Sequence, residues 1–455
     1  MNLIAPFCRW CNSLFLKDKL LMTLKLSTYI CVVLFGSTSW LSTNSVWLQL
    51  PLLTKELPEG WSLPSYLTVV VQIATVGSLV YSIIRKYWKI SFPTAPVILV
   101  LLLFCCSCTV LMGMFWCQTF FLFGQKRSVA LMILLFGMAL VNGTSNVLFM
   151  PYMATFNASY LTAYFVGMGL SSLFPSIISI LQGSGNECVT VNGTSMQTNG
   201  ILQFGITEFN FIMLIWMLFA TAAFVYLILS KNVISEEKEL PKDQSPIKSS
   251  LPVDETGSLN VTEFSLLRQH TETHAADDNL QVDKLRLGLL LFLMTVVNAQ
   301  MNGIVPSVQS YASLPFSQRT YHFGLTLSNI VSPIVCFLPL FVKIIRLSVL
   351  VLLTLVSTVL TGLIITFAAM SPTPVLQFST WGSVLIIAIV VCSVALNSFL
   401  RTVLATLLGD DATDSETRLF WGGVFIQVGS FLGSIAMFPL INIFDFFVSA
   451  PPCSK

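Results

Sequence analysis

Uncharged polar side chains recur inside the most apolar stretches of the chain. Asn44, Gln72, Asn298 and Asn302 carry carboxamides, and Thr68 lies four residues before Gln72. An offset of four residues places both members of a pair on one face of a helix. A carboxamide has four hydrogen-bonding sites that are costly to leave unpaired in hydrocarbon. We therefore predict that these groups bind a neutral polar ligand. Helix packing is the alternative, and it is favoured for Ser and Thr hydroxyls.

Carboxylates, in contrast, are confined to loops and to the ends of the apolar stretches. Ion- or proton-coupled carriers and intramembrane hydrolases usually need ionisable groups at membrane depth. Glu56 and Glu59 follow the first stretch and are expected to be solvated or to act in gating. The three histidines lack metal-ligand spacing to the cysteines, so no metal or cofactor is expected. The pattern disfavours an enzyme or an ion pump, although sodium coupling through backbone carbonyls stays open.

Aromatic residues accompany the same segments. Trp61 and Tyr66 flank an expected membrane boundary, where Trp and Tyr commonly form an interfacial belt. Trp40 lies deeper in its segment. We predict that its indole ring is a stacking platform for a flat ligand ring.

The elements that must position these residues are membrane-spanning helices. Only 10 % of the 455 residues are charged, against about 25 % in soluble proteins. The net charge of +2 argues against nucleic-acid binding. We expect an all-α polytopic membrane protein with eleven transmembrane helices, because apolar runs of about 20 residues suffice to span a bilayer. The predicted spans are 27–48, 65–84, 94–116, 128–150, 159–181, 209–230, 285–305, 322–342, 346–369, 382–407 and 419–442.

A polar segment divides these spans into groups of six and five. Its Ser, Pro and charged residues are typical of a disordered linker. Most Lys and Arg residues face the cytoplasm if the N-terminus is inside, as the positive-inside rule requires. The expected domains are a cytoplasmic arm (1–26), a six-helix bundle (27–230), a cytoplasmic linker (231–284), a five-helix bundle (285–442) and an extracellular tail (443–455).

The two groups of spans resemble each other in one short motif. Gly169-Leu-Ser-Ser-Leu-Phe-Pro175 and Gly433-Ser-Ile-Ala-Met-Phe-Pro439 share G-x-x-x-x-F-P, and each lies in the fifth span of its group. This indicates a repeat of the kind found in two-bundle transporters. The first span of each group is then equivalent, so Asn44 should face Asn298 and Asn302 across a cavity, with Gln72 joining them.

Four N-x-S/T sequons begin at Asn142, Asn157, Asn192 and Asn260. The predicted topology places the first inside a span and the second and fourth in the cytoplasm. We therefore predict glycosylation at Asn192 only.

The stretch Leu57-Pro-Glu-Gly-Trp-Ser-Leu-Pro-Ser-Tyr-Leu-Thr-Val-Val-Val-Gln72, preceded by Trp40 and Asn44, resembles the eukaryotic riboflavin transporters. So does Asn302-Gly-Ile-Val-Pro-Ser-Val-Gln-Ser-Tyr311. The resemblance implies an eleven-span carrier, similar in helix arrangement to major-facilitator and equilibrative nucleoside transporters, that moves riboflavin without Na⁺. It adds Gln309 and Tyr311 to the predicted substrate-binding residues.

One departure concerns a disulfide that the resemblance implies. Family members have a Cys where this chain has Thr373, and that Cys pairs with one in the C-terminal tail. Cys453 therefore lacks its expected partner, and Cys117 and Cys188 are the remaining candidates.

We expect a plasma-membrane carrier that takes up riboflavin by Na⁺-independent facilitated, alternating-access transport. Riboflavin is uncharged and joins a flat hydrogen-bonding ring to a polyol chain, which suits a cavity of carboxamides and aromatic rings. A carrier for another neutral heterocycle, such as a nucleoside, and a polytopic receptor are the alternatives. The expected partners are riboflavin and the lipid bilayer, with no obligatory protein partner.

Overall fold

The computed structural model describes residues 26–88, 93–122, 124–154, 158–183, 187–191, 194–198, 202–230, 283–342, 346–409 and 415–449. The expected cytoplasmic arm and linker lie almost wholly outside these residues. Asn192 and Cys453 also lie outside them.

Helices form most of the described chain, because a backbone in lipid must satisfy its polar groups within its own segment. The N-terminal helices are Leu26–Ser37, α2 (Leu41–Glu56), α3 (Leu63–Trp88), α4 (Thr94–Phe115), α5 (Val129–Ala154), α6 (Ala158–Gln182) and α7 (Ile206–Leu229), with the short η1 (Gly60–Ser62) before α3. The C-terminal helices are Asp283–Ser313, which includes the π-helical η3 (Ala299–Ile304) and α10 (Val305–Ser313), α11 (Gln318–Cys336), η4 (Leu338–Leu340), α12 (Leu347–Ala369), α13 (Thr380–Gly409) and α14 (Ser415–Asn442). Every predicted span overlaps one of these helices.

Seven described helices are long and apolar enough to cross a membrane. The count rises to eight if Leu26–Ser37 and α2, which meet at a bend of 51°, form one span. The protein is therefore a multi-pass membrane protein. The count of eleven spans and its division into six and five stay predictions.

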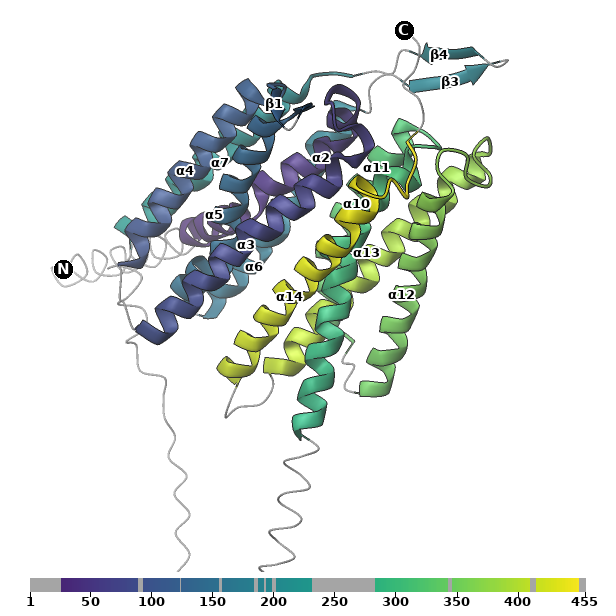
Figure 1. Ribbon diagram of the computed structural model, residues 1–455. Helices are drawn as coiled ribbons and strands as arrows, with labels where there is room; N and C mark the ends of the chain where they lie inside the picture. Colours follow the sequence, from purple (N-terminus) through teal and green to yellow (C-terminus); the bar gives the residue numbers. More distant parts are fainter. Residues whose placement is uncertain are drawn as a thin grey trace, which may run out of the picture.

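The helices lie in two neighbouring groups. Those before residue 231, purple to teal, occupy one part of the molecule, and those after residue 282, green to yellow, occupy the other (Figure 1). In the first group α3 packs against α5, and α4 packs against α5 and α7. In the second group α13 packs against α11 and α12, and α14 packs against η3. The groups meet where α10 and α14 contact α3 and where α11 contacts α2 and α6.

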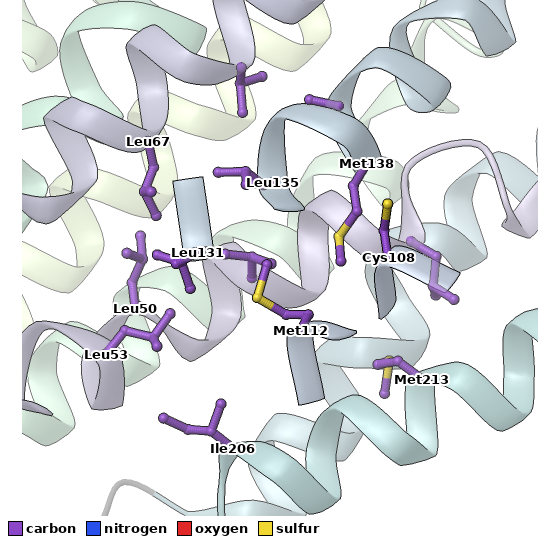
Figure 2. Close-up of a cluster of buried hydrophobic side chains, with 14 of the residues drawn as sticks. Leu50, Leu53, Leu67, Cys108, Met112, Leu131, Leu135, Met138, Ile206 and Met213 are labelled. Atoms are coloured by element: carbon purple, nitrogen blue, oxygen red, sulfur yellow. The ribbon is translucent and has the colours of Figure 1, made fainter. Parts of the chain in front are cut away.

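The interior of the first group is apolar. Figure 2 shows side chains of α2, α3, α4, α5 and α7 meeting in one cluster, among them Leu50, Leu67, Met112, Leu131 and Met213. This packing fixes the helices that carry the polar residues of the candidate site.

Two helix boundaries differ from the predicted spans. The first span is broken at residues 38–40, and its second part continues to Glu56. Side-chain hydroxyls stabilise the break. Those of Ser37 and Thr38 each donate to a carbonyl three residues earlier at 2.7 Å, and that of Ser39 donates to the carbonyl of Gly36. The predicted span 322–342 begins earlier, at Gln318, and its α-helix ends at Cys336.

Two β-hairpins that were not predicted lie in loops. β1 (Phe120–Leu122) pairs antiparallel with β2 (Gln125–Arg127), and β3 (Glu187–Val191) pairs antiparallel with β4 (Thr194–Thr198). β3 and β4 project beyond the helix ends at the top of Figure 1. Asn192 falls in the connection between them.

Glu59 is buried and hydrogen-bonded, so it is not solvated; the alternative expectation, a role in gating, stays a prediction. Only 8 % of its surface is exposed. Its carboxylate accepts hydrogen bonds from the backbone N–H and the hydroxyl of Ser128, both at 2.7 Å, directly before α5. A carboxylate at a helix N-terminus satisfies open N–H groups and complements the helix dipole. Glu59 therefore ties the loop before α3 to the start of α5.

A candidate substrate site between the two helix groups

Carboxamides from three helices converge where the two groups meet. Gln427 on α14 donates from Nε2 to Oε1 of Gln72 on α3 at 2.9 Å. Gln72 donates from Nε2 to the backbone oxygen of Asn302 at 3.4 Å. Asn302 donates from Nδ2 to Oδ1 of Asn298 at 3.3 Å and to the hydroxyl of Ser430 at 3.0 Å. We call Gln72, Asn298, Asn302 and Gln427 the carboxamide cluster.

The backbone oxygen of Asn302 lacks the usual N–H donor of an α-helix because of the proline at position 306. Pro306 has no N–H, so it cannot donate to the oxygen of Asn302, four residues earlier. The preceding N–H, from Val305, donates to Gln300 instead, as a π-helical turn requires. Gln72 of the other group supplies the missing donor. Single π turns inside α-helices are frequent at functional sites.

Glycines bring α14 close enough to η3 for these contacts. A Cβ atom at Gly433 would overlap the backbone oxygen of Ala299, and one at Gly429 would overlap that of Thr295. A Cβ atom at Gly303 would overlap the backbone of Ser434. Small residues allow this backbone approach between membrane helices. The cluster therefore rests on a tightly packed pair of helices.

Asn44 and Thr68 do not join the cluster. Asn44 donates from Nδ2 to the backbone oxygen of Ser171 on α6 at 3.3 Å, within its own group. That oxygen is open because Pro175 cannot donate to it. The buried hydroxyl of Thr68 donates to Pro64 of its own helix at 2.6 Å. In this conformation both residues therefore serve helix structure.

The remaining predicted site residues, Trp40, Gln309 and Tyr311, make no hydrogen bond to the cluster within the described part of the chain. Trp40 is half-buried at the break before α2. Tyr311 on α10 is buried, and its ring centroid lies 6.0 Å from that of Trp61 and 5.7 Å from that of Phe447. Gln309 is also buried, and its Nε2 has no hydrogen-bond partner. Trp61 therefore packs against α10 of the other group, and its place at the membrane interface stays a prediction.

Gln427 was not among the predicted site residues, although a carboxamide inside a predicted span is the signal that selected Gln72. Gln427 is a carboxamide inside the predicted span 419–442, as Gln72 is inside 65–84. A survey of every span for Asn and Gln also finds Gln300, whose amide donates to Thr358 at 2.7 Å and accepts from Ser357 at 3.0 Å. Gln300 therefore joins the second group internally, whereas Gln427 joins the two groups.

A small cavity of about 10 Å³, with room for about one water molecule, lies elsewhere, inside the first group. It is lined by Val46, Gln49, Leu53, Met112, Trp116, Leu131, Ile206 and Asn210. Most of this lining is apolar, and the cavity borders the cluster of Figure 2. It therefore suits core packing better than a polar ligand.

Solved structures show the class of the fold. A POT family peptide transporter matches with a TM-score of 0.55 and 11 % identity, covering 92 % of this chain and 90 % of that chain. The nucleoside transporter NupG matches with a TM-score of 0.51 and 12 % identity, covering 92 % of each chain. The protein has the helical fold of major-facilitator-like membrane transporters.

Sequence comparison assigns the chain to one family within this fold class. Residues 24–449 match the model of solute carrier family 52, riboflavin transporter, and the chain belongs to this family. The riboflavin transporter rft-1 of Caenorhabditis elegans is 44 % identical over 94 % of this chain and 99 % of its own length. The human solute carrier family 52, riboflavin transporter, member 3 is 31 % identical over 94 % of this chain and 98 % of its own length.

Proposed function

We propose that this protein carries riboflavin into cells across the plasma membrane, by Na⁺-independent facilitated transport with alternating access. Its family membership supports the substrate. The carboxamide cluster supports the chemistry, because uncharged donors and acceptors at the meeting of two helix groups match an uncharged ring with several nitrogen and oxygen atoms along its edge. This cluster is the single structural observation that carries the proposal.

Alternating access requires the two bundles, 27–230 and 285–442, to move against each other around the site. Three hydrogen bonds between the groups lie near the helix ends that adjoin η1: Ser310 to the oxygen of Trp61 at 2.7 Å, Asn442 to Ser65 at 2.8 Å, and His322 with Ser179 at 3.0 Å. We propose that these contacts close the outer side and that they open before riboflavin enters.

Of the predicted substrate-binding residues, Gln72, Asn298 and Asn302 are proposed to bind the ring through their amides. Trp40, at the break before α2, is proposed to stack on it. Replacing Trp40 by Ala should then cost more uptake than replacing it by Phe, which keeps an aromatic ring.

The energetics follow from where the carboxylates lie. Within the described helices Asp and Glu occur only near helix ends, as Glu56, Glu208 and Asp283 do. We propose that no ion is coupled to transport. Uptake should therefore persist when choline replaces Na⁺, whereas a steep dependence on Na⁺ would contradict uniport.

The proposed orientation has a cytoplasmic N-terminus and an extracellular C-terminus. The connection between β3 and β4 is then extracellular, and Asn192 carries the glycan. Asn192→Gln should abolish the glycosidase-sensitive gel shift. A shift that persists in this variant but disappears with Asn260→Gln would invert the topology.

The decisive experiment is uptake of radiolabelled riboflavin by cells that lack their own carrier. Saturable uptake should be competed by unlabelled riboflavin and not by a nucleoside such as uridine. Stronger competition by the nucleoside would favour the alternative heterocycle. Absence of uptake despite normal surface expression would contradict the proposal.

A further inference from the structure

Buried polar groups without partners gather on α10 and α11. They are Nε2 of Gln309, the hydroxyl of Tyr321, Nδ1 of His322 and the hydroxyls of Thr326 and Ser328. Each of these residues is more than nine-tenths buried. Buried polar groups in proteins are normally hydrogen-bonded, and leaving them unpaired is costly. We call these five residues the polar stripe.

The hydroxyls of Thr326 and Ser328 behave unlike those of buried threonines in other helices. Thr109 on α4 and Thr354 on α12 each donate to the carbonyl four residues earlier in their own helix, at 2.9 Å and 2.8 Å. Thr326 and Ser328 make no such bond. Their hydroxyls are therefore available to a partner outside the helix.

Tyr321, His322 and Thr326 of the polar stripe face the other helix group, and Gln309 lies against their helix. His322 bonds through Nε2 to Ser179 of α6, and Tyr321 and Leu325 belong to the same apolar cluster as residues of α2. Thr326 lies one turn after His322 and therefore shares its face. Gln309 reaches α11 at Gly324, where Nε2 lies 3.6 Å from the position of a Cβ atom.

The polar stripe also continues from the carboxamide cluster. Gln309 follows Asn302 by seven residues on the same helix, which corresponds to about two turns or 10 Å. A ligand held at the cluster could therefore extend along α10 and α11 toward the outer helix ends.

We infer that the polar stripe is a subsite for the polyol chain of the substrate, while the carboxamide cluster receives the edge of the ring. This inference rests on the proposed function. Each hydroxyl of a polyol donates one hydrogen bond and accepts others, so a row of single hydroxyl, imidazole and amide groups complements it. The ring edge, with donors and acceptors side by side, instead matches carboxamides.

The test compares two ligands that differ only in the polyol. Lumiflavin keeps the flavin ring but has a methyl group in place of the ribityl chain. In Thr326→Val and Ser328→Ala the half-saturation concentration for riboflavin uptake should rise about two- to tenfold, as expected for one lost hydrogen bond. The inhibition constant of lumiflavin should stay unchanged. Thr354→Val, a buried threonine bonded within α12, is the matched control and should alter neither value.

Thermal stability in detergent, measured without ligand, separates binding from folding. Thr326→Val removes an unpaired buried hydroxyl at nearly constant volume, so the variant should be at least as stable as the wild type. Riboflavin should raise its melting temperature less than it raises that of the wild type.

Two results would overturn the inference: equal weakening of riboflavin and lumiflavin, or unchanged affinity for both in variants that reach the surface. A wild-type protein that transports neither flavin would instead overturn the proposed function itself.

Discussion

The first long helix of each group is interrupted, but the backbone carbonyls at the two interruptions find their hydrogen-bond donors in different places. In the first group the chain bends by 51° after Ser37, and the carbonyls at the bend accept hydrogen bonds from the same turn: the hydroxyls of Ser37, Thr38 and Ser39, together with the N–H groups of Thr38 and Ser39. In the second group the helix runs on through the π turn of η3, and the oxygen of Asn302 is taken by Gln72 from the other group.

The break after Ser37 is therefore self-contained, whereas the break at η3 connects the two groups. The bend after Ser37 depends on local hydroxyls and should survive a rearrangement of the groups. The contact at Asn302 must change whenever α3 moves relative to η3. The second break is therefore the better candidate for coupling ligand binding to the movement of the bundles.

The two groups also share a feature, the close approach of their first and fifth helices. Gly36 and Gly167 meet between Leu26–Ser37 and α6, as Gly429 and Gly433 meet Asp283–Ser313 from α14. These are the helices that the G-x-x-x-x-F-P motif relates. The shared packing supports an internal repeat, in which the polar contacts have diverged.

The largest effect should follow from Gly433→Ala. The added Cβ atom would overlap the oxygen of Ala299, so α14 must move away, at a cost of about 1–3 kcal/mol for overpacking. Most of the folded protein should be lost in fluorescence-detected size-exclusion chromatography. Gly423→Ala is the matched control on the same helix, because no heavy atom lies within 4 Å of its Cβ position. Equal stability of the two variants would refute the need for close approach.

Removing the connecting contact should come next. In Gln72→Ala and Asn302→Ala each lost hydrogen bond should cost about 0.5–1.5 kcal/mol, which near its upper end is a tenfold loss in apparent affinity for riboflavin. Asn210→Ala, a buried carboxamide that donates within α7 at 2.8 Å, should leave the affinity unchanged. If both variants reach the surface normally and take up riboflavin with an unchanged half-saturation concentration, these amides serve helix packing and not substrate binding.

The self-contained break should respond differently. Thr38→Val removes a hydroxyl that bonds Phe35 within the same turn, so thermal stability should fall by about 0.5–1.5 kcal/mol. The half-saturation concentration for uptake should not change. A loss of affinity without a loss of stability would show that the two breaks do not differ as described.

The smallest effect is the coupling between Asn44 and Pro175, which is only a part of the cost of losing the Asn44 amide. The amide of Asn44 matters because Pro175 leaves the oxygen of Ser171 open. Asn44→Leu should destabilise the wild type by about 0.5–1.5 kcal/mol, but less in a Pro175→Ala background, where residue 175 has an N–H to donate. Equal destabilisation in both backgrounds, measured as a double-mutant cycle, would exclude this coupling.

The sequence predicts helix positions well because an apolar run of membrane length allows only a helix. It predicts their interruptions less well. Pro306 shows from the sequence that one backbone donor is missing. Whether the helix then kinks or forms a π turn depends on its packing against α14. The sequence between β3 and β4 carries a recognisable signal, because an Asn-Gly pair, here Asn192-Gly193, is typical of a two-residue hairpin turn.

Site residues were predictable by type but not by partner. Gln72 and Asn302 were selected as costly carboxamides, and the structure joins them. Asn44 was selected on the same ground, yet it contacts α6, because periodicity gives the face of a helix but not its register against a neighbour. Thr326 was assigned to packing as the default for hydroxyls, and only its unpaired state in the structure distinguishes it.

The pairing of a proline with a distant amide has a consequence for how such sequences diverge. Pro306 makes the oxygen of Asn302 dependent on Gln72, and Pro175 makes that of Ser171 dependent on Asn44. A lineage that replaces either proline regains an internal donor and relaxes selection on the corresponding amide. Among relatives, Pro306 should therefore covary with Gln72 and Pro175 with Asn44, although the members of each pair lie far apart in the sequence. Such covariation would arise from a missing N–H rather than from side-chain complementarity.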